Sequence, residues 1–228
     1  MIKKAFQIDK INFAEHNLYL FYGENDGYKN EIIKNIFEKK YKNQTYKYDE
    51  KEVLEKTTDF FNSILSKSFF EDEKLIIISR ATDKIKNIIE EVQSKKIDEI
   101  KIILSSGILE KKSKLRNYFE KEKELVCIAF YADNNQTLGN IAHNFIRNKK
   151  ISISQEIINL LVERCKGNRE NLNNELKKIE NFSMYGKKIK NEDIMKLTNL
   201  AENYSTSELI DSCLSKNIKR TSNILNEN

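Results

Sequence analysis

A loop containing two glycines and a lysine follows the first strongly apolar stretch of the chain, in the order that phosphate binding uses. Residues 18–22 read LYLFY, and residues 23–30 read GENDGYKN. In a phosphate-binding loop of the form GxxxxGK followed by Ser or Thr, backbone N–H groups cradle the phosphates, the lysine reaches the outer ones and the hydroxyl holds magnesium. Here the loop is one residue short between the glycines, carries Glu24 and Asp26, and has Asn30 in place of the hydroxyl. We therefore interpret Gly23, Gly27 and Lys29 as a degenerate, non-functional phosphate loop.

The end of the third apolar stretch also lacks the groups that nucleotide hydrolysis needs. An ATPase that uses such a phosphate-binding loop presents an acidic pair at the end of this third strand, but residues 75–80 read LIIISR. The three cysteines, Cys127, Cys165 and Cys213, lie far apart and form no CxxC pair, so we expect no metal site. We expect no catalytic site of the chain's own and no cofactor.

Two adjacent phenylalanines, Phe69 and Phe70, precede the same apolar stretch and follow an amphipathic helical segment that ends with Ile64 and Leu65. A polar turn of residues 71–73 separates the rings from the stretch. Two large rings beside a turn either fill this protein's own core or insert into a pocket of another protein. The residues alone leave both interpretations open.

A basic group opens the segment after the fourth apolar stretch, where residues 111–123 have helical periodicity. Phosphate contact needs only well-placed cations, which this group supplies. A solvated helix face is the alternative. The group consists of Lys111, Lys112, Lys114 and Arg116.

Strand and helix signals alternate along the first part of the chain, and these elements must position the loop, the rings and the basic group. Apolar runs predict strands at residues 18–22, 44–48, 75–79, 100–105 and 125–131, with helical periodicity between them. Continuous apolar runs are typical of parallel strands that are buried on both faces. We predict a three-layer α/β domain with a five-stranded, mainly parallel sheet over residues 1–134.

Helical periodicity replaces the strand signals after residue 134. Segments 138–146, 155–165, 169–184 and 191–197 predict a small all-helical domain over residues 135–200. Gly167 and Gly186 stand just past helix ends, and Asn168 is a predicted helix cap. A further pair of helices is predicted within residues 201–228, and its apolar faces have no remaining sequence to pack against. Either the chain stops partway into a third, helical domain, or this last pair docks on a partner.

Composition restricts the class of protein. Charged residues make up 33% of the 228 residues and apolar residues 39%, and no run approaches the ~18 apolar residues of a membrane span. No segment resembles a signal peptide, so we expect a reduced, cytoplasmic protein with no membrane partner. A net charge of +5 permits contact with nucleic acid but does not demand it.

Taken together, an α/β domain followed by a helical lid is the layout of AAA+ proteins, and the chain resembles one family with that layout, the delta subunit of the bacterial DNA polymerase III clamp loader. The resemblance covers the whole chain. It depends on LYLFYGENDGYKNE (18–31), SFFEDEKLIII (68–78), GNRENLNNELKKIE (167–180) and NEDIMKL (191–197). It also implies that residues 201–228 are the first helices of a C-terminal collar domain, most of which the chain lacks.

The resemblance implies a function and partners. The delta subunit binds the sliding clamp (beta subunit) and opens this ring so that it can be loaded on primed DNA during replication, while neighbouring subunits hydrolyse ATP. Its wedge is a Leu-Phe pair, which falls on Phe69 and Phe70 here, with Ile64 and Leu65 as flanking contacts. The family architecture would also let the helix opened by Lys111, Lys112, Lys114 and Arg116 approach the DNA backbone. The implied partners are the clamp, the tau/gamma and delta prime subunits and primed DNA within the loader, a complex that belongs to the DNA-directed DNA polymerase holoenzyme. Two alternatives remain: an AAA+ ATPase with a divergent nucleotide loop, and a free-standing DNA-binding protein.

Overall fold

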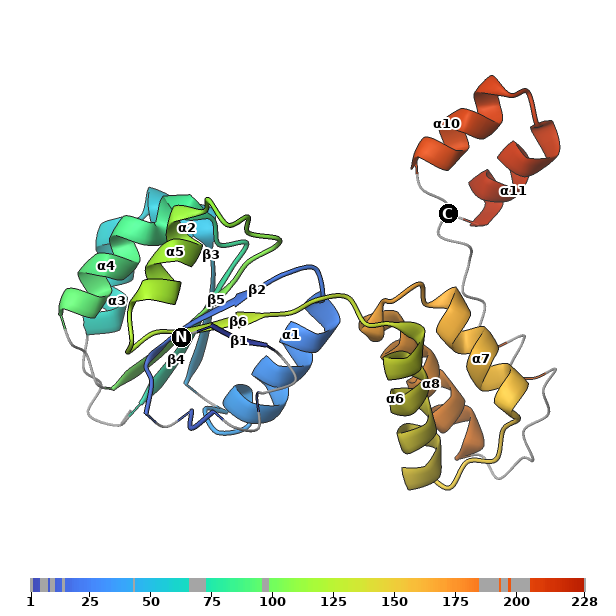
Figure 1. The fold of residues 1–228 in the computed structure, drawn as a ribbon, viewed down its shortest axis with the longest axis horizontal. Coiled ribbons are helices and arrows are strands. Elements are labelled where there is room, and N and C mark those ends of the chain that lie inside the picture. Colours follow the sequence, from blue (N-terminus) through green and yellow to red (C-terminus); the bar gives the residue numbers. More distant parts are fainter. Residues whose placement is uncertain are drawn as a thin grey trace. The chain divides into compact units, whose positions relative to one another are not determined.

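The computed structural model describes residues 2–4, 8, 11–13, 15–42, 44–65, 73–95, 99–184, 193, 197 and 206–227. The chain divides into two compact units, Met1–Ala132 and Asp133–Asn228, which are described separately below (Figure 1). The first unit contains the sheet, and the second contains only helices among its described residues.

The sheet of the first unit has six strands in the order β1-β6-β2-β5-β4-β3, and every neighbouring pair is parallel. The five predicted strands are confirmed, with ends shifted by a few residues. A sixth, β1, was not predicted because three residues reading IKK carry no periodic signal; it lies at the edge beside β6. The strands are β1 (Ile2–Lys4), β2 (Leu18–Tyr22), β3 (Thr45–Asp49), β4 (Lys74–Ser79), β5 (Ile100–Ser105) and β6 (Val126–Ala129).

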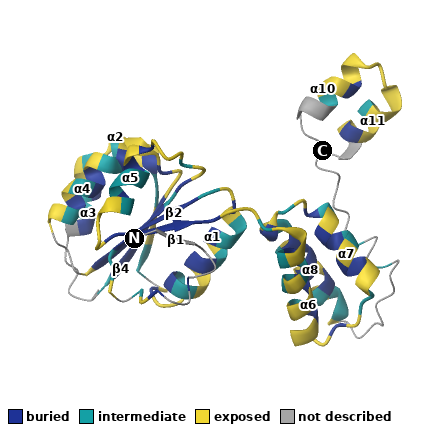
Figure 2. Cartoon of the chain, in the orientation of Figure 1, coloured by how far each residue is buried: buried dark blue, intermediate teal, exposed yellow. Residues whose placement is uncertain are grey.

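Two separate hydrophobic clusters cover the two faces of the sheet, which confirms the predicted three-layer α/β architecture (Figure 2). Side chains alternate along each strand, so neighbours such as Leu20 and Phe21 enter opposite clusters. One face packs against α1 (Asp26–Ile32) and the π-helical segment η2 (Ile33–Glu38). The other packs against α2 (Glu50–Glu55), α3 (Thr57–Leu65), η3 (Asp83–Ile85), α4 (Lys86–Ser94) and α5 (Lys114–Lys121).

Three helices of the second unit share one core, namely α6 (Asn135–Asn148), α7 (Gln155–Arg164) and α8 (Arg169–Ser183). The side chains of Asn134, Ser154 and Asn168 cap their first turns, which confirms the predicted cap at Asn168. Gly167 has φ +81 just after α7, as expected of a residue that ends a helix. Gly186 and most of the segment 191–197 lie outside the described residues.

Two further helices in the described part of the second unit, α10 (Thr206–Leu214) and α11 (Ile218–Glu227), contact each other and bury Ile224. Four large apolar side chains on this pair are exposed: Ile210, Leu214, Ile218 and Leu225. Within the part of the chain that the structure describes, no helix has both the length and the apolar character that crossing a membrane requires.

Candidate functional site

The connection between α3 and β4 carries the two phenylalanines that the sequence singles out. Phe69 and Phe70 lie outside the described residues, as does the whole segment 66–72. Ile64, on the last turn of α3, is only 3% exposed and belongs to the hydrophobic core beneath the sheet. It is therefore a packing residue and does not offer an exposed contact, which corrects its assignment as a flanking contact. The backbone of Leu65 ends α3, but its side chain is outside the described residues.

The first anchor of this connection is Glu73, the residue immediately before β4. The Tyr41 hydroxyl donates to Glu73 Oε2 at 2.6 Å, and Lys40 Nζ lies 3.0 Å from the same oxygen. The hydrogen bond from Tyr41, assisted by that from Lys40, lowers the pKa of the Glu73 carboxyl below its usual range. Glu73, at the C-terminal end of the connection, is thus bonded to Lys40 and Tyr41, which follow η2.

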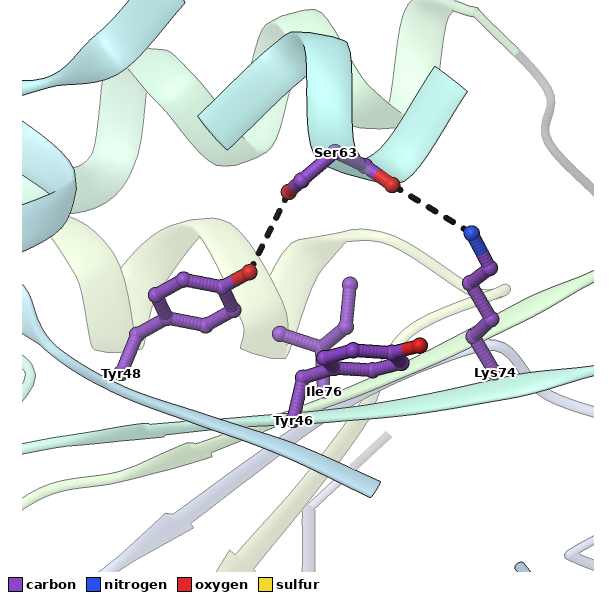
Figure 3. Close-up of a pocket in the computed structure, with 5 residues that line it drawn as sticks. All are labelled: Tyr46, Tyr48, Ser63, Lys74 and Ile76. Atoms are coloured by element: carbon purple, nitrogen blue, oxygen red, sulfur yellow. Dashed lines mark hydrogen bonds between the residues drawn. The ribbon is translucent and has the colours of Figure 1, made fainter. Parts of the chain in front are cut away.

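The second anchor is Lys74, the first residue of β4, whose side chain points to the opposite face of the sheet from Glu73. Lys74 Nζ donates to the backbone oxygen of Ser63 at 3.4 Å, and Ser63 lies near the end of α3 (Figure 3). The end of α3 and the start of β4 are thereby joined directly. Both ends of the 66–72 segment are fixed to the folded unit.

A small pocket of about 140 Å³ lies at this junction, between the edge strand β3, the end of α3 and the start of β4. Tyr48 and Lys74 approach Ser63 from opposite sides, with Ile76 below them (Figure 3). The Tyr48 hydroxyl lies 3.2 Å from Ser63 Oγ, and Ser63 Oγ donates to the backbone oxygen of Phe60 at 2.7 Å. We call this the junction pocket, and the residues that line it are Tyr46, Tyr48, Ser63, Lys74 and Ile76.

The degenerate phosphate loop is folded against the end of β6. Gly23 has φ +124, and a Cβ atom there would lie 2.1 Å from the carbonyl oxygen of Phe130, so only glycine fits. The Asn25 side chain caps α1 by accepting from Tyr28 N and donates to the carbonyl of Tyr131 at 3.0 Å. Gly27 lies in the first turn of α1. The loop is therefore hydrogen-bonded to Phe130 and Tyr131, the two residues that follow β6.

Lys29, the lysine of this loop, is only 1% exposed, and its ammonium is directed into the protein. Its Nζ donates to the backbone oxygens of Gly23 at 2.9 Å and Ser106 at 2.6 Å, and lies 2.7 Å from Asp26 Oδ1. An ammonium group has three donors, and these three oxygens match that number. In this arrangement Lys29 connects the loop after β2 to the end of β5.

The end of β4 carries Ser79 and Arg80 instead of an acidic pair. Arg80 adopts φ +56 and pairs with Asp49 at 2.6 Å across the β3–β4 boundary. The nearby carboxylate of Glu50 is 7% exposed and accepts hydrogen bonds from the backbone N–H and hydroxyl of Thr82. These acidic groups are thus engaged in contacts within the protein.

The predicted basic group divides into exposed and structural members. Lys111 and Lys112 lie in the turn before α5, which begins at Lys114 because Ser113 caps it, so they do not open the helix as predicted. Both are exposed, as is Lys114. The guanidinium of Arg116, in contrast, is engaged within the protein: its Nε pairs with Glu120 at 2.6 Å and its Nη1 donates to Leu109 O at 3.0 Å.

Sequence reasoning missed the polar contacts that tie distant segments together. Asp83 is one example: its Oδ1 accepts from Ser113 Oγ at 2.5 Å and from Leu115 N at 3.0 Å. Burial raises the pKa of the Asp83 carboxyl, but these hydrogen bonds together outweigh burial and lower it. Asp83 and Ser113 are 30 residues apart, so no local sequence pattern indicates that they interact.

Among the described residues, no group of three or more His, Cys, Asp or Glu side chains is placed to hold a metal ion.

Comparison with known proteins supports the architecture. No protein-family model and no curated protein sequence gives a significant match to the chain. Among solved structures, the Bacillus subtilis DNA clamp loader delta protein matches with a TM-score of 0.54 at 15% identity, over 98% of this chain and 70% of that one. The Thermotoga maritima RuvB Holliday junction branch migration motor matches with a TM-score of 0.56 at 10% identity, over 87% and 69%. At these identities the likeness shows the fold, which is AAA+-like: a parallel α/β sheet domain with helical parts.

Proposed function

We propose that this chain is a clamp-loader subunit of the delta type, which binds a ring-shaped sliding clamp and opens it for loading on primed DNA without hydrolysing ATP itself. The observation that carries the proposal is the structural likeness over 98% of the chain to a clamp loader delta protein, combined with the adjacent Phe69 and Phe70 in the sequence between α3 and β4. The tau/gamma and delta prime subunits would supply ATP hydrolysis and the remaining contacts.

The two anchors that follow the 66–72 segment support the role given to the two rings. Two rings that insert into a partner need a fixed base, and Glu73 is bonded to Tyr41 while Lys74 is bonded to Ser63, near the end of the helix that precedes the segment. Burial of one phenylalanine ring in a partner's pocket contributes ~1.5–3 kcal/mol. Because that corresponds to roughly a tenfold to hundredfold change in affinity, each ring is expected to be a main contributor to clamp binding.

The bonding of Lys29 supports a subunit that works without nucleotide. A phosphate-binding lysine must present its ammonium to the ligand, whereas Lys29 donates to Gly23 O and Ser106 O inside the protein. Nucleotide at a hundred times its dissociation constant would stabilise a binding protein by about 2.7 kcal/mol. We expect no thermal shift with millimolar ATP and magnesium; a clear shift would instead favour an AAA+ ATPase.

The three exposed lysines before and at the start of α5 are candidate contacts to the DNA backbone within the assembled loader. Lys111, Lys112 and Lys114 are exposed, and Arg116 holds the turn in place through Leu109. Their contribution depends on the rest of the loader, because three cations give only weak, salt-dependent binding on their own. Tight DNA binding by the isolated chain would contradict this view and favour a free-standing DNA-binding protein.

Co-purification with the cognate sliding clamp tests the proposal. The wild-type chain is expected to retain the clamp, and Phe70→Ala and Phe69→Ala are expected to lose most of it. Tyr131→Ala is the matched control, because Tyr131 is an aromatic residue that is 61% exposed and lies after β6, away from the α3–β4 connection in sequence. Equal retention by wild type and Phe70→Ala would contradict the assigned role of the rings.

A further inference from the structure

Two exposed basic residues, Arg80 and Lys84, lie in the segment that runs from the end of β4 into η3. Asp83 joins this segment to the start of α5, because its Oδ1 accepts hydrogen bonds from the Ser113 hydroxyl and from a backbone N–H of the first turn of α5. Lys84 follows Asp83 directly, and Lys114 follows Ser113. The fold therefore places two lysines that are distant in sequence beside each other.

Arg80 lies at the same end of the sheet. Its neighbour Ala81 donates to Ser105 O at 3.0 Å and accepts from Ser106 Oγ at 2.6 Å, so Arg80 is fixed next to the carboxyl end of β5. The loop that carries the other lysines leaves β5 at this point. We define the basic surface as the five exposed cations of these two segments: Arg80, Lys84, Lys111, Lys112 and Lys114.

Three partly or fully exposed carboxylates adjoin the basic surface, so its five cations are in excess. Asp49 pairs with Arg80 at 2.6 Å and Glu110 pairs with Lys112 at 2.9 Å, while Asp83 is bonded to the start of α5. Even the two paired cations are 80% and 86% exposed. The three other lysines of the surface form no ion pair within the part of the chain that the structure describes.

The backbone of Arg80 has a left-handed conformation, with φ +56, which is unfavourable for a residue with a Cβ atom. Three other described residues that are not glycine have positive φ, namely Lys150, Lys166 and Lys216, and each follows the end of a helix, where this conformation is common. Arg80 instead follows a strand. Glycine would adopt this conformation at lower cost, so the arginine indicates a role for the side chain itself.

The turn that carries Lys111 is fixed by the protein's own contacts. The Asn117 side chain donates to Lys111 O at 2.9 Å, and Arg116 Nη1 donates to Leu109 O at 3.0 Å. A partner therefore does not have to order this turn, which lowers the cost of binding. Exposed cations spread over two segments suit an extended polyanion, whose condensed counterions they displace, better than one small anion.

We propose that Arg80 and Lys84 bind the phosphate backbone of duplex DNA together with Lys111, Lys112 and Lys114. This inference rests on the proposed function, in which the three lysines before and at the start of α5 approach DNA, and it adds two residues from a separate segment. Contacts from cations to phosphates do not read the base sequence, so binding through this surface is independent of sequence.

The test measures the fluorescence anisotropy of a labelled duplex of mixed sequence with the full chain, over a series of salt concentrations. Wild type is expected to bind weakly at low salt and to lose affinity steeply as salt rises. Because each phosphate contact contributes about −0.9 to the slope of log K against log salt, Arg80→Gly and Lys84→Gln should each flatten that slope by about one and weaken binding at low salt roughly three- to tenfold. Lys34→Gln is the control.

Lys34 is an exposed lysine of η2, which covers the opposite face of the sheet from α5, so Lys34→Gln removes the same charge elsewhere. Its affinity for the duplex should stay within about twofold of wild type. Arg80→Gly should melt at or above the wild-type temperature, because it relieves the left-handed backbone and removes only a surface ion pair. Weaker DNA binding by this variant is then not a result of unfolding.

Clamp retention is measured in parallel for every variant and should equal that of wild type. The inference would be overturned by wild-type slope and affinity in both Arg80→Gly and Lys84→Gln, by an equal loss in Lys34→Gln, or by wild type that does not bind the duplex even at the lowest salt. A loss of clamp binding in Lys84→Gln would overturn it as well, since the surface would then contact the clamp. Each of these results leaves the proposed function standing, whereas a wild-type chain that does not bind the clamp would contradict that function.

Discussion

The ammonium of Lys29 donates a hydrogen bond of 2.6 Å to the backbone oxygen of Ser106, 77 residues further along the chain. This contact places Lys29, a residue of α1, against the end of β5, in the part of the sheet where doubly wound α/β proteins usually bind ligands. The lysine that sequence reasoning assigned to a lost phosphate site thus has a structural contact.

Replacing Lys29 should therefore affect stability. Lys29→Met leaves the backbone oxygens of Gly23 and Ser106 without their donor, and each unpaired buried group costs about 1–3 kcal/mol. We expect the free energy of unfolding to fall by about 2–4 kcal/mol in urea denaturation, which detects such a change through a lower midpoint. Lys34→Met, at an exposed position of η2, is the control and should change little. An unchanged midpoint in Lys29→Met would mean that the ammonium does not support the loop.

Gly23→Ala tests the contact between the loop and β6. The new Cβ would lie 2.1 Å from Phe130 O at a residue with φ +124, so the backbone has to shift. We expect a loss of roughly 2–4 kcal/mol in the free energy of unfolding, as for other strongly strained positions. At Gly107 a Cβ meets nothing within 4 Å, and Gly107→Ala should cost less than about 1 kcal/mol. Similar effects of the two substitutions would contradict the described packing.

The buried ion pair of the helical unit should be far more sensitive than a surface pair. Arg169 Nε and Nη2 lie 2.7 and 2.8 Å from the two carboxylate oxygens of Asp133, and both side chains are 8% exposed. Removing one partner leaves a buried charge, so Asp133→Asn is expected to cost about 3–5 kcal/mol in thermal or chemical denaturation. Lys112→Met removes an exposed pair with Glu110 and should stay within about 0.5 kcal/mol. Equal midpoints for both variants would show that the buried pair contributes no more than the surface one.

Glu73 should give the chain a pH-dependent contribution to stability. The folded protein holds the pKa of Glu73 below its usual value, first through Tyr41 and then through Lys40, so the contribution is present above the unfolded pKa of ~4.3 and is lost as the pH falls through the folded pKa. Glu73→Gln should therefore be less stable than wild type near pH 7, and the difference should shrink toward pH 3. Guanidinium unfolding at both pH values measures it. A difference in the free energy of unfolding between wild type and Glu73→Gln that stays constant or widens in acid would contradict the ion pair.

Much of the fold could be predicted because its signals are local. The stretches around Leu20 and Ile77 are continuously apolar because helices cover both faces of the sheet. The edge strand β1 escaped prediction, since an edge strand of three residues needs no periodic pattern. The turn that contains Lys111 was assigned to the helix, because the Ser113 that caps α5 is bonded to Asp83, 30 residues away in the sequence.

The candidate site was less predictable, because its polar contacts join segments that are distant in sequence. The sequence identifies Phe69 and Phe70 as unusual, but it does not indicate that Glu73 and Lys74, adjacent in sequence, bond to opposite layers. Ile64 had the spacing of both a core residue and a flanking contact, and burial decides in favour of the core. The junction pocket requires β3, α3 and β4 together, so no single segment could reveal it.

The dissociation constant of the cognate sliding clamp from the wild-type chain and from Phe70→Ala tests the central claim most directly. The account predicts that Phe70→Ala binds at least tenfold more weakly, since one buried ring contributes ~1.5–3 kcal/mol, while its thermal melt stays within a degree or two of wild type. Equal affinities, or a loss of binding that accompanies loss of the fold, would contradict the claim that Phe70 is held out for a partner.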